Sequence, residues 1–398
     1  MKKGWEYKKL GEVAIFSRGL TYSKKDEVVF SDNIVLRSNN VDLVSGQIIF
    51  DELKYLSNDF CIPNEKKVKK GSLLMCMSNG SKIHLGKVAL VKEDYGYAFG
   101  GFMSLVTPFK DIDSKFFYYT LITPTYKQYI KSLSEGANIN NLKIKDLENF
   151  VIPLPPLSEQ KEIVEYLDSS FAKIDKLKEN AAKNLEEAKA LFQSALKDAL
   201  EPKEGWITST LKDECHKITD GTHQTPHYFT DGYIFLSSKN VTNRVIDWDN
   251  VKYIDEAQHQ AMQKRVSPKV GDILLAKNGT TGVGAIVDRE IEFDIYVSLA
   301  LLRTKGNVIP EYMLCFVNSP MAKQQFNKRL IGMGVPNLHL GEINQVEISY
   351  PPNKTEQKEI VKRLNELDDK VNTLQQNYSR ICNECDALKQ AILRQVFE

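Results

Sequence analysis

This sequence of 398 residues has few cysteines and no long apolar run, and each scarcity excludes a class of protein. The six cysteines are scattered at positions 61, 76, 215, 315, 382 and 385, so they form no disulfide framework. No apolar run is long enough to span a bilayer, and polar residues interrupt the first ten residues, where a signal peptide needs an apolar core. We therefore expect a cytoplasmic protein with reduced thiols and no membrane contact.

Net charge is also almost absent, at +1. Residues 1–150 hold 22 Lys and Arg against 17 Asp and Glu, whereas residues 201–353 hold 16 against 18. Because nucleic-acid binding relies on phosphate neutralisation, any DNA contact must be local or shared with a partner that supplies positive charge.

Motifs for DNA methylation and DNA translocation are missing. A methyltransferase needs Asn-Pro-Pro-aromatic, but residues 350–353 read Tyr-Pro-Pro-Asn, the reverse order. A translocating ATPase needs GxxxxGK[ST], but Gly86-Lys87 is followed by Val88. We predict that the chain has no catalytic residue of its own.

Two weaker patterns are compatible with metal chemistry. Residues 51–54 (Asp-Glu-Leu-Lys) have the acid-x-Lys spacing of some nucleases, a spacing that is also common on solvated surfaces. Cys382 and Cys385 form a lone CxxC without a second pair of ligands. We expect no metal site.

The chain repeats itself at an offset near 200 residues. The six residues EQKEIV occur at 159–164 and again at 356–361. Weaker matches lie upstream of this string, in the same order in both copies: Gly4-Trp5 with Gly205-Trp206, 34–41 with 234–241, 71–74 with 271–274, Asn79-Gly80-Ser81 with Asn278-Gly279-Thr280, and Asn141-Leu142 with Asn337-Leu338. This period is too long for a solenoid, so we predict a duplicated domain, each copy followed by a helix.

Each copy ends in a long predicted helix. Pro155-Pro156 and Pro351-Pro352 prevent an earlier start, and Ser158 and Thr355 can cap the helices. Apolar residues then recur with 4,3 spacing over about four heptads, which is typical of a coiled coil. The predicted seam residues are Leu167, Phe171, Ile174, Leu185, Phe192, Leu364, Leu367, Val371, Leu374, Ile381 and Leu388.

The two seams are complementary in size, since the first is rich in Ala and the second in Leu, Ile and Tyr. We therefore predict that the helices pair with each other, each being about 60 Å long. Separate packing of each helix on its own domain is the alternative.

Short apolar runs separated by glycine-rich turns indicate strands in the regions before the helices, so we predict an α+β fold. The predicted parts are a first domain at 1–152, a central helix at 153–200, a second domain at 201–352 and a C-terminal helix at 353–398.

Candidate base readers are polar residues that follow predicted strands at corresponding positions of the two copies. Arg, Lys, Asn and Gln can form paired hydrogen bonds with base edges, while Ser and Thr bind phosphates. Because Asn-Gly also favours tight turns, a purely structural role is the alternative. The candidates are Arg37, Ser38, Asn39, Asn40, Ser78, Asn79, Gly80, Ser81 and Lys82 in the first copy, and Thr222, His223, Gln224, Thr225, Lys239, Asn240, Lys277, Asn278, Gly279, Thr280 and Thr281 in the second.

The junction between domain and helix resembles a known family. Residues 152–164 (IPLPPLSEQKEIV), preceded by Asn141-Leu142-Lys143, are similar to the junction in specificity subunits of type I restriction-modification systems. The second junction, at 348–357, lacks the Leu-Ser step of the first. The order of domain, helix, domain, helix also fits that family, so the resemblance implies that the two domains are target-recognition domains and the two long helices are spacer helices.

The resemblance implies antiparallel helices, a pseudo-two-fold axis, and a bipartite double-stranded DNA target with an unread gap. It also implies two modification subunits that use S-adenosylmethionine, and restriction (motor-nuclease) subunits that use ATP and Mg. None of these cofactors would bind to this chain. Two other hypotheses stay open: a self-contained DNA nuclease, and a coiled-coil scaffold that does not read DNA.

Overall fold

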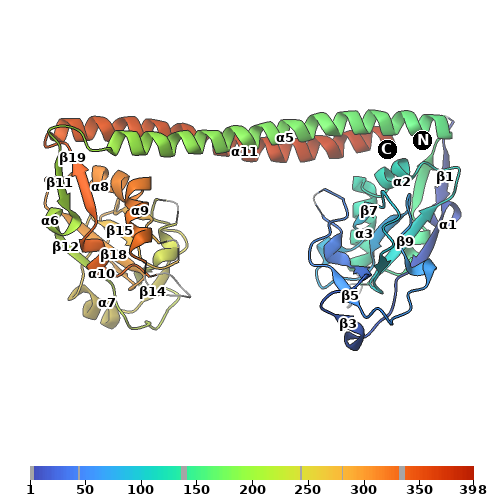
Figure 1. Ribbon diagram of the computed structural model, residues 1–398, viewed down its shortest axis with the longest axis horizontal. Coiled ribbons are helices and arrows are strands. Elements are labelled where there is room, and N and C mark those ends of the chain that lie inside the picture. The colour runs from blue at the N-terminus through green and yellow to red at the C-terminus, as the bar shows by residue number, and fades with distance from the viewer. Residues whose placement is uncertain (1–3, 44, 136–140, 243, 280, 331–336) are drawn as a thin grey trace. The chain divides into compact units, whose positions relative to one another are not determined.

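The structure is a computed structural model that describes residues 4–43, 45–135, 141–242, 244–279, 281–330 and 337–398. The chain divides into two compact units: unit 1 holds residues 1–180 and 380–398, and unit 2 holds residues 181–379. Each unit combines a mixed domain with part of both long helices, α5 (Leu157–Leu200) and α11 (Lys354–Phe397) (Figure 1). The predicted α+β fold with two long helices is confirmed.

Unit 1 contains two four-stranded sheets, in the orders β2-β9-β6-β7 and β3-β5-β4-β8, and a two-stranded ribbon, β1-β10. Neighbouring strands are antiparallel except for the parallel pair β4–β8. The strands are β1 (Glu6–Lys9), β2 (Ala14–Arg18), β3 (Glu27–Val28), β4 (Asn33–Leu36), β5 (Lys54–Leu56), β6 (Leu73–Cys76), β7 (Val88–Leu90), β8 (Ala98–Phe99), β9 (Met103–Pro108) and β10 (Val151–Leu154). The helices before α5 are α1 (Leu10–Val13), α2 (Ser114–Thr120), α3 (Pro124–Glu135) and α4 (Ile144–Glu148).

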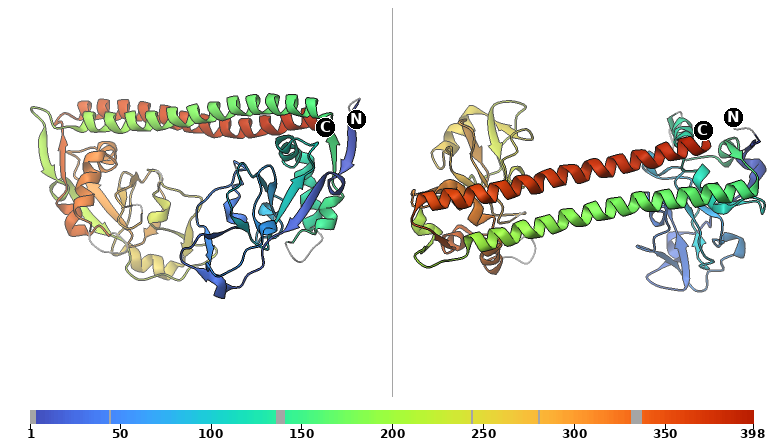
Figure 2. Two further views of the ribbon diagram at one scale, coloured as in Figure 1. Left: turned by 45° about the vertical axis from the view of Figure 1, so that its right-hand side comes forward. Right: turned by 90° about the horizontal axis from the view of Figure 1, so that it is seen from above.

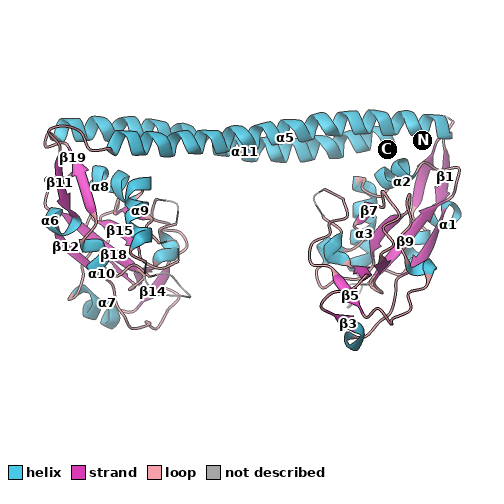
Figure 3. Cartoon of the chain, viewed as in Figure 1, coloured by secondary structure: helices cyan, strands magenta, loops and turns pink. Residues whose placement is uncertain are grey.

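Unit 2 repeats this plan (Figure 3). Its sheets have the orders β12-β18-β15-β16 and β14-β13-β17, its ribbon is β11-β19, and β13–β17 is again the parallel pair. The strands are β11 (Ile207–Thr210), β12 (Cys215–Asp220), β13 (Tyr233–Leu236), β14 (Lys252–Ile254), β15 (Ile273–Ala276), β16 (Gly284–Ile286), β17 (Phe293–Ile295), β18 (Leu299–Thr304) and β19 (Glu347–Tyr350). The helices before α11 are α6 (Leu211–Glu214), α7 (Glu256–Gln263), α8 (Pro310–Val317), α9 (Pro320–Lys328) and α10 (Leu340–Asn344).

The strands β6 and β15 are apolar at every position because both of their faces are covered. In β6, Leu73 and Met75 belong to one hydrophobic cluster, whereas Leu74 and Cys76 belong to another. Ile273 to Ala276 of β15 divide between two clusters in the same alternating way. The polar residues that follow these strands are thereby anchored to a rigid base.

Within each unit, α5 and α11 run side by side in opposite directions (Figure 2). In unit 1, Lys178 pairs with Asp386 at 2.9 Å and Asp175 with Lys389 at 2.5 Å, which is an antiparallel register. In unit 2, Phe192 and Val371 lie in one core with residues of the domain. The helices thus pair with each other and pack on the domains.

A buried glutamine joins each long helix to its domain. The Gln160 side chain accepts a hydrogen bond from Asp113 N and donates one to Pro155 O, both 2.9 Å long. Gln357 accepts from Ile309 N and donates to Pro351 O, also at 2.9 Å. These two residues are the Gln of the repeated EQKEIV string, so the exact repetition has a structural reason.

The structure corrects part of the predicted seam. Leu167, Ile174, Leu185, Phe192, Leu364 and Val371 are buried, and Phe171 and Ile381 are half-buried. Leu367, Leu374 and Leu388, however, are 38%, 40% and 50% exposed. A single partner helix covers only a narrow strip of α11, so one position per heptad is enclosed and the next lies at the edge.

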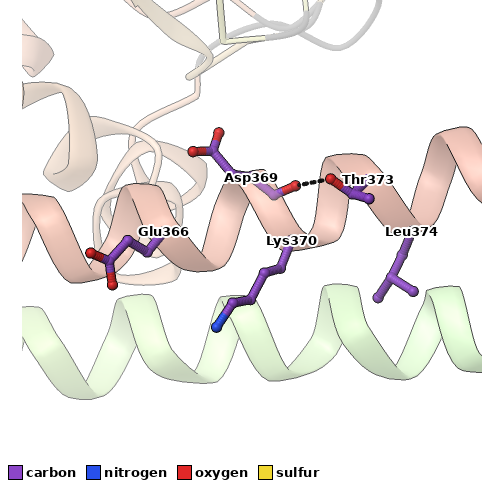
Figure 4. A pocket seen from close by; sticks show the side chains of 5 residues that line it. All are labelled: Glu366, Asp369, Lys370, Thr373 and Leu374. Atoms are coloured by element: carbon purple, nitrogen blue, oxygen red, sulfur yellow. Dashed lines mark hydrogen bonds between the residues drawn. The ribbon is translucent and has the colours of Figure 1, made fainter.

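An open hollow of about 620 Å³ lies on α11 at this edge, lined by Glu366, Asp369, Lys370, Thr373 and Leu374 (Figure 4). The Lys370 side chain points toward the neighbouring helix, whereas the Asp369 carboxylate points to the opposite side of α11 (Figure 4). The hollow is therefore a groove beside the seam. Among the described residues, no helix is long and apolar enough to cross a membrane.

The contrast between Leu364 and Leu367 predicts unequal effects of truncation. Leu364→Ala removes a side chain that is 3% exposed, and should lower the free energy of unfolding by about 2–5 kcal/mol. Leu367→Ala, at a position that is 38% exposed, should cost less than about 1 kcal/mol. Urea unfolding followed by circular dichroism measures both, and equal losses would contradict the observed seam.

Candidate nucleic-acid interface

In unit 1, the two predicted clusters of polar residues meet. Ser38 follows β4, Asn79 follows β6, and the Asn79 side-chain amide donates a 2.7 Å hydrogen bond to the Ser38 hydroxyl. The Cys76 thiol donates to the same hydroxyl at 3.3 Å. Burial, which is the largest influence, raises the pKa of the Cys76 thiol, so the group stays protonated at neutral pH. The ends of strands from two sheets therefore form one polar surface.

The other predicted residues of unit 1 surround this contact. Arg37 and Asn39 both approach Glu52 O at 3.4 Å. The Arg37 Nε atom is buried, and within the described part of the chain it has no hydrogen-bond partner. Ser78 is half-buried, and Gly80 and Ser81 form an exposed turn in which Ser81 N donates to Asn79 Oδ1 at 2.9 Å. Lys82 is bound to Ser134 O at 3.0 Å.

Asn40 and Asn240 are structural rather than surface residues. Asn40 is 0% exposed, and its side chain accepts from Arg37 N and donates to Ile49 O and Asp51 O. Asn240, 6% exposed, accepts from Ser237 N and donates to Asp247 O and Asn250 O. The oxygen and the nitrogen of each side-chain amide are both hydrogen-bonded to backbone groups, so neither side chain is free to contact a base. This corrects the prediction that Asn40 and Asn240 read bases.

In unit 2, three side chains surround Asp220, which is 3% exposed at the end of β12, and form an ion cluster with it. Lys277 Nζ donates to one carboxylate oxygen at 2.7 Å, and Arg265 Nη2 donates to the other at 2.6 Å. His223 Nε2 lies 3.2 Å from the carboxylate. Lys277 is itself 4% exposed, so this predicted reader is a buried ion-pair partner, and its ammonium is not free to contact DNA.

The cluster opens into a pocket of about 610 Å³, whose polar lining includes Asp220, His223, Arg265, Lys277, Asn278, Asn337 and His339. The Oδ1 atoms of Asn278 and Asn337 are buried and have no hydrogen-bond partner among the residues that the structure describes. The structure thus brings three of the predicted residues, His223, Lys277 and Asn278, together in one pocket. Arg265 and Asp220 were not predicted, since neither belongs to a motif.

The remaining predicted residues of unit 2 lie around this pocket or apart from it. Thr222 N donates to Ile295 O at 3.0 Å, and Thr222 is followed by the exposed Gln224 and Thr225. Lys239 and Gly279 are exposed, and the Thr281 hydroxyl donates to Lys277 O at 3.3 Å. Thr280 lies outside the described residues. Whether any of these residues contacts DNA stays a prediction.

The structure shifts the predicted correspondence between the copies by one residue. Ser78 forms an isolated bridge with Asn141, and Asn278 forms the same bridge with Asn337. Ser78, not Asn79, is therefore the counterpart of Asn278, and Met77 is the counterpart of Lys277. Both turns contain Asn-Gly, but the dipeptide lies one residue later after the strand in unit 1 than in unit 2.

An exposed aromatic residue was also missed. Phe102 is 71% exposed, and its carbonyl accepts hydrogen bonds from Met77 N and Ser78 N at 2.9 and 3.2 Å. It therefore lies beside the polar surface of unit 1. The preceding Gly100-Gly101 was the only sequence signal of a tight connection at this place.

The part of the chain that the structure describes contains no group of three or more His, Cys, Asp or Glu side chains suited to a metal. Lys54, from the acid-x-Lys pattern, pairs with Glu27 at 2.6 Å. Cys385 is buried and Cys382 half-buried on α11. These contacts favour structural roles for both patterns.

The ion cluster predicts a pH dependence of stability. Burial raises the pKa of Asp220, but hydrogen bonds from Lys277 and Arg265 outweigh it and hold the pKa below the ordinary value of 3.8. A carboxylate whose pKa is lower in the folded than in the unfolded state stabilises the fold at pH values above its unfolded pKa. This stabilisation is lost as the pH falls through the pKa of the folded state.

Asp220→Asn should therefore lower the free energy of unfolding by about 3–5 kcal/mol at neutral pH, since Lys277 stays buried without its partner. The difference from wild type should shrink below pH 3.8, as Asp220 becomes protonated. Urea unfolding at a series of pH values measures this, and a difference independent of pH would disprove the assignment.

Comparison with known proteins adds a family. A family model described as "Type I restriction modification DNA specificity domain" matches residues 2–187 and 203–381. The type I restriction enzyme EcoKI specificity subunit of Escherichia coli K12 is 26% identical over 419 residues, covering 100% of this chain and 89% of that protein.

Two solved structures share the fold. A chain from a study of complex assembly and conformational transition of the type I R-M system has a TM-score of 0.77 and 19% identity, covering 99% of this chain and 98% of that chain. The HsdS subunit from Thermoanaerobacter tengcongensis has a TM-score of 0.57 and 18% identity, covering 100% and 97%.

Proposed function

This chain belongs to the type I restriction-modification DNA specificity family, and from that premise we propose that it reads a bipartite double-stranded DNA target, one half-site with each unit. The family is one of specificity subunits, so the chain is a non-catalytic component.

The proposal is carried by one observation: the two units share a backbone arrangement but have different side chains at corresponding strand ends. Arg18 and Asp220 each precede a glycine that passes against a neighbouring strand, since a Cβ on Gly19 or Gly221 would lie 2.0 or 1.8 Å from a carbonyl oxygen. The same strand ends thus present Arg18, Met77 and Ser78 in unit 1, but Asp220, Lys277 and Asn278 in unit 2. Different side chains on one frame suit the reading of two different half-sites.

We propose that the helix pair sets the length of the unread gap and relates the two units by a pseudo-two-fold axis. With 44 residues, α5 is about 66 Å long, more than one duplex turn of about 34–36 Å. A paired helix of this length is stiff enough to act as a spacer.

The proposed partners follow from the family. Two modification subunits would bind S-adenosylmethionine, and restriction subunits would use ATP and Mg, while this chain would bind none of these cofactors. Partners that contribute phosphate contacts also account for a chain whose net charge is only +1. The cytoplasm is the proposed location, because the DNA target lies there.

Exchange of one domain tests this function. Replacing residues 1–152 by the matching segment of another specificity subunit should change one half of the methylated sequence and leave the other half and the gap unaltered. Mapping methylated adenines in cells that express the complex measures the result. A change in both halves would contradict the proposal.

The purified chain and its complex also distinguish this function from the two alternatives, a nuclease and a scaffold. Metal-dependent cleavage by the purified chain, abolished by Asp51→Ala, would favour a nuclease. A complex that leaves no sequence-dependent footprint on DNA would favour a scaffold.

A further inference from the structure

We infer that Arg265 reads a guanine in the half-site recognised by unit 2, and that Asp220 is the residue that positions it. The inference rests on the proposed function and adds to it the class of base and the residue that recognises it. Arg265 lies between α7 and β15, at the rim of the pocket described above.

Asp220 binds one edge of the Arg265 guanidinium. Arg265 Nε donates to Asp220 O at 3.1 Å and Nη2 donates to Asp220 Oδ1 at 2.6 Å, while the side chain stays 49% exposed. Among the described residues, Nη1 makes no hydrogen bond. The outer edge of the fork is formed by Nη1 and Nη2, and His223 Nε2 lies 3.5 Å from Nη2, at the limit of hydrogen-bond length. Because the His223 side chain is 63% exposed, it does not enclose this edge, which is fixed in direction and accessible to a ligand.

The charges of the cluster favour an acceptor on the ligand. The buried pair of Asp220 and Lys277, 2.7 Å apart, neutralises one negative and one positive charge. The surplus positive charge is that of Arg265, on the exposed side. A fixed guanidinium edge of this kind matches the O6 and N7 acceptors of guanine in the major groove, the commonest specific contact of arginine.

The corresponding place in unit 1 is chemically different. There Lys66 Nζ donates to Arg18 O at 2.9 Å, as Arg265 Nε does to Asp220 O. Lys66 has a single ammonium, whereas Arg265 has a planar guanidinium with two donor edges. The partner of Lys66 is the Arg18 backbone carbonyl, and no carboxylate takes the place of Asp220 because that residue is Arg18. Unit 1 thus lacks the fixed fork, so the inference applies to one half-site only.

The chain offers a matched control at the other end of β15. Arg303 also donates through Nε and Nη2 to a buried carboxylate, that of Asp272, at 2.7 and 2.6 Å. Asp272 precedes β15 whereas Lys277 follows it, so this second pair lies away from the pocket. Arg303→Lys therefore alters a similar ion pair without touching the proposed reading site.

The test uses the full chain assembled with its modification subunits. After the methylated motif is mapped, each guanine of the half-site is replaced in turn by 7-deazaguanine, which lacks the N7 acceptor. Binding of the wild-type complex should weaken on the order of 10- to 100-fold at one of these positions. Arg265→Lys should relax the sequence preference at that position and remove its sensitivity to 7-deazaguanine.

Asp220→Asn should reduce discrimination at the same position and at no other, whereas Arg303→Lys should keep the wild-type motif. A half-site without any G·C pair, or one where no 7-deazaguanine weakens the wild-type complex, would overturn the inference without the need for a variant. So would an Arg265→Lys complex that loses affinity uniformly for all sequences, since that result indicates a phosphate contact. These results leave the proposed function intact, whereas a wild-type complex that methylates no bipartite motif overturns both.

Discussion

The buried glutamine at the start of each long helix is the contact on which the rest of the structure depends. Gln160 and Gln357 are 1% and 0% exposed, and each bridges the first turn of its helix to backbone groups of the domain before it. A buried amide that is hydrogen-bonded through both its oxygen and its nitrogen has one favourable position, because any shift leaves a polar group unsatisfied. Each helix therefore starts at a defined place on its domain.

Within one chain, the residues that build the fold are separate from the residues that differ between the two units. The sheet cores and the helix starts are built alike in both units, with β6 and β15 covered on both faces. The residues just beyond these strands then differ without disturbing the frame: Met77 packs in an apolar cluster, while Lys277 neutralises a buried carboxylate. A buried ion pair is costly to desolvate and gives little net stability, so its presence in unit 2 alone fits a role in orienting Arg265.

The sequence predicted the repeat, the α+β domains and the paired helices, because prolines, caps and a heptad pattern are local signals. It did not reveal the roles of Asn40 and Asn240, whose amides bind backbone groups seven to eleven residues away along the chain. Leu367 and Leu374 were placed in the seam because spacing alone does not show how much of a helix its partner covers. Arg265 and Asp220 are 45 residues apart in sequence and are joined only by the fold.

We propose that the helix pair determines the distance between the two reading surfaces. Residues 174–180 of α5 and 384–390 of α11 face each other in unit 1, since Lys178 pairs with Asp386 and Asp175 with Lys389. Deleting both segments removes one heptad and both partners of each ion pair, which shortens the pair by about 10 Å. Mapping of methylated adenines should then give the same two half-sites with a gap shorter by roughly two to three base pairs. An active complex whose gap is unaltered would contradict the account.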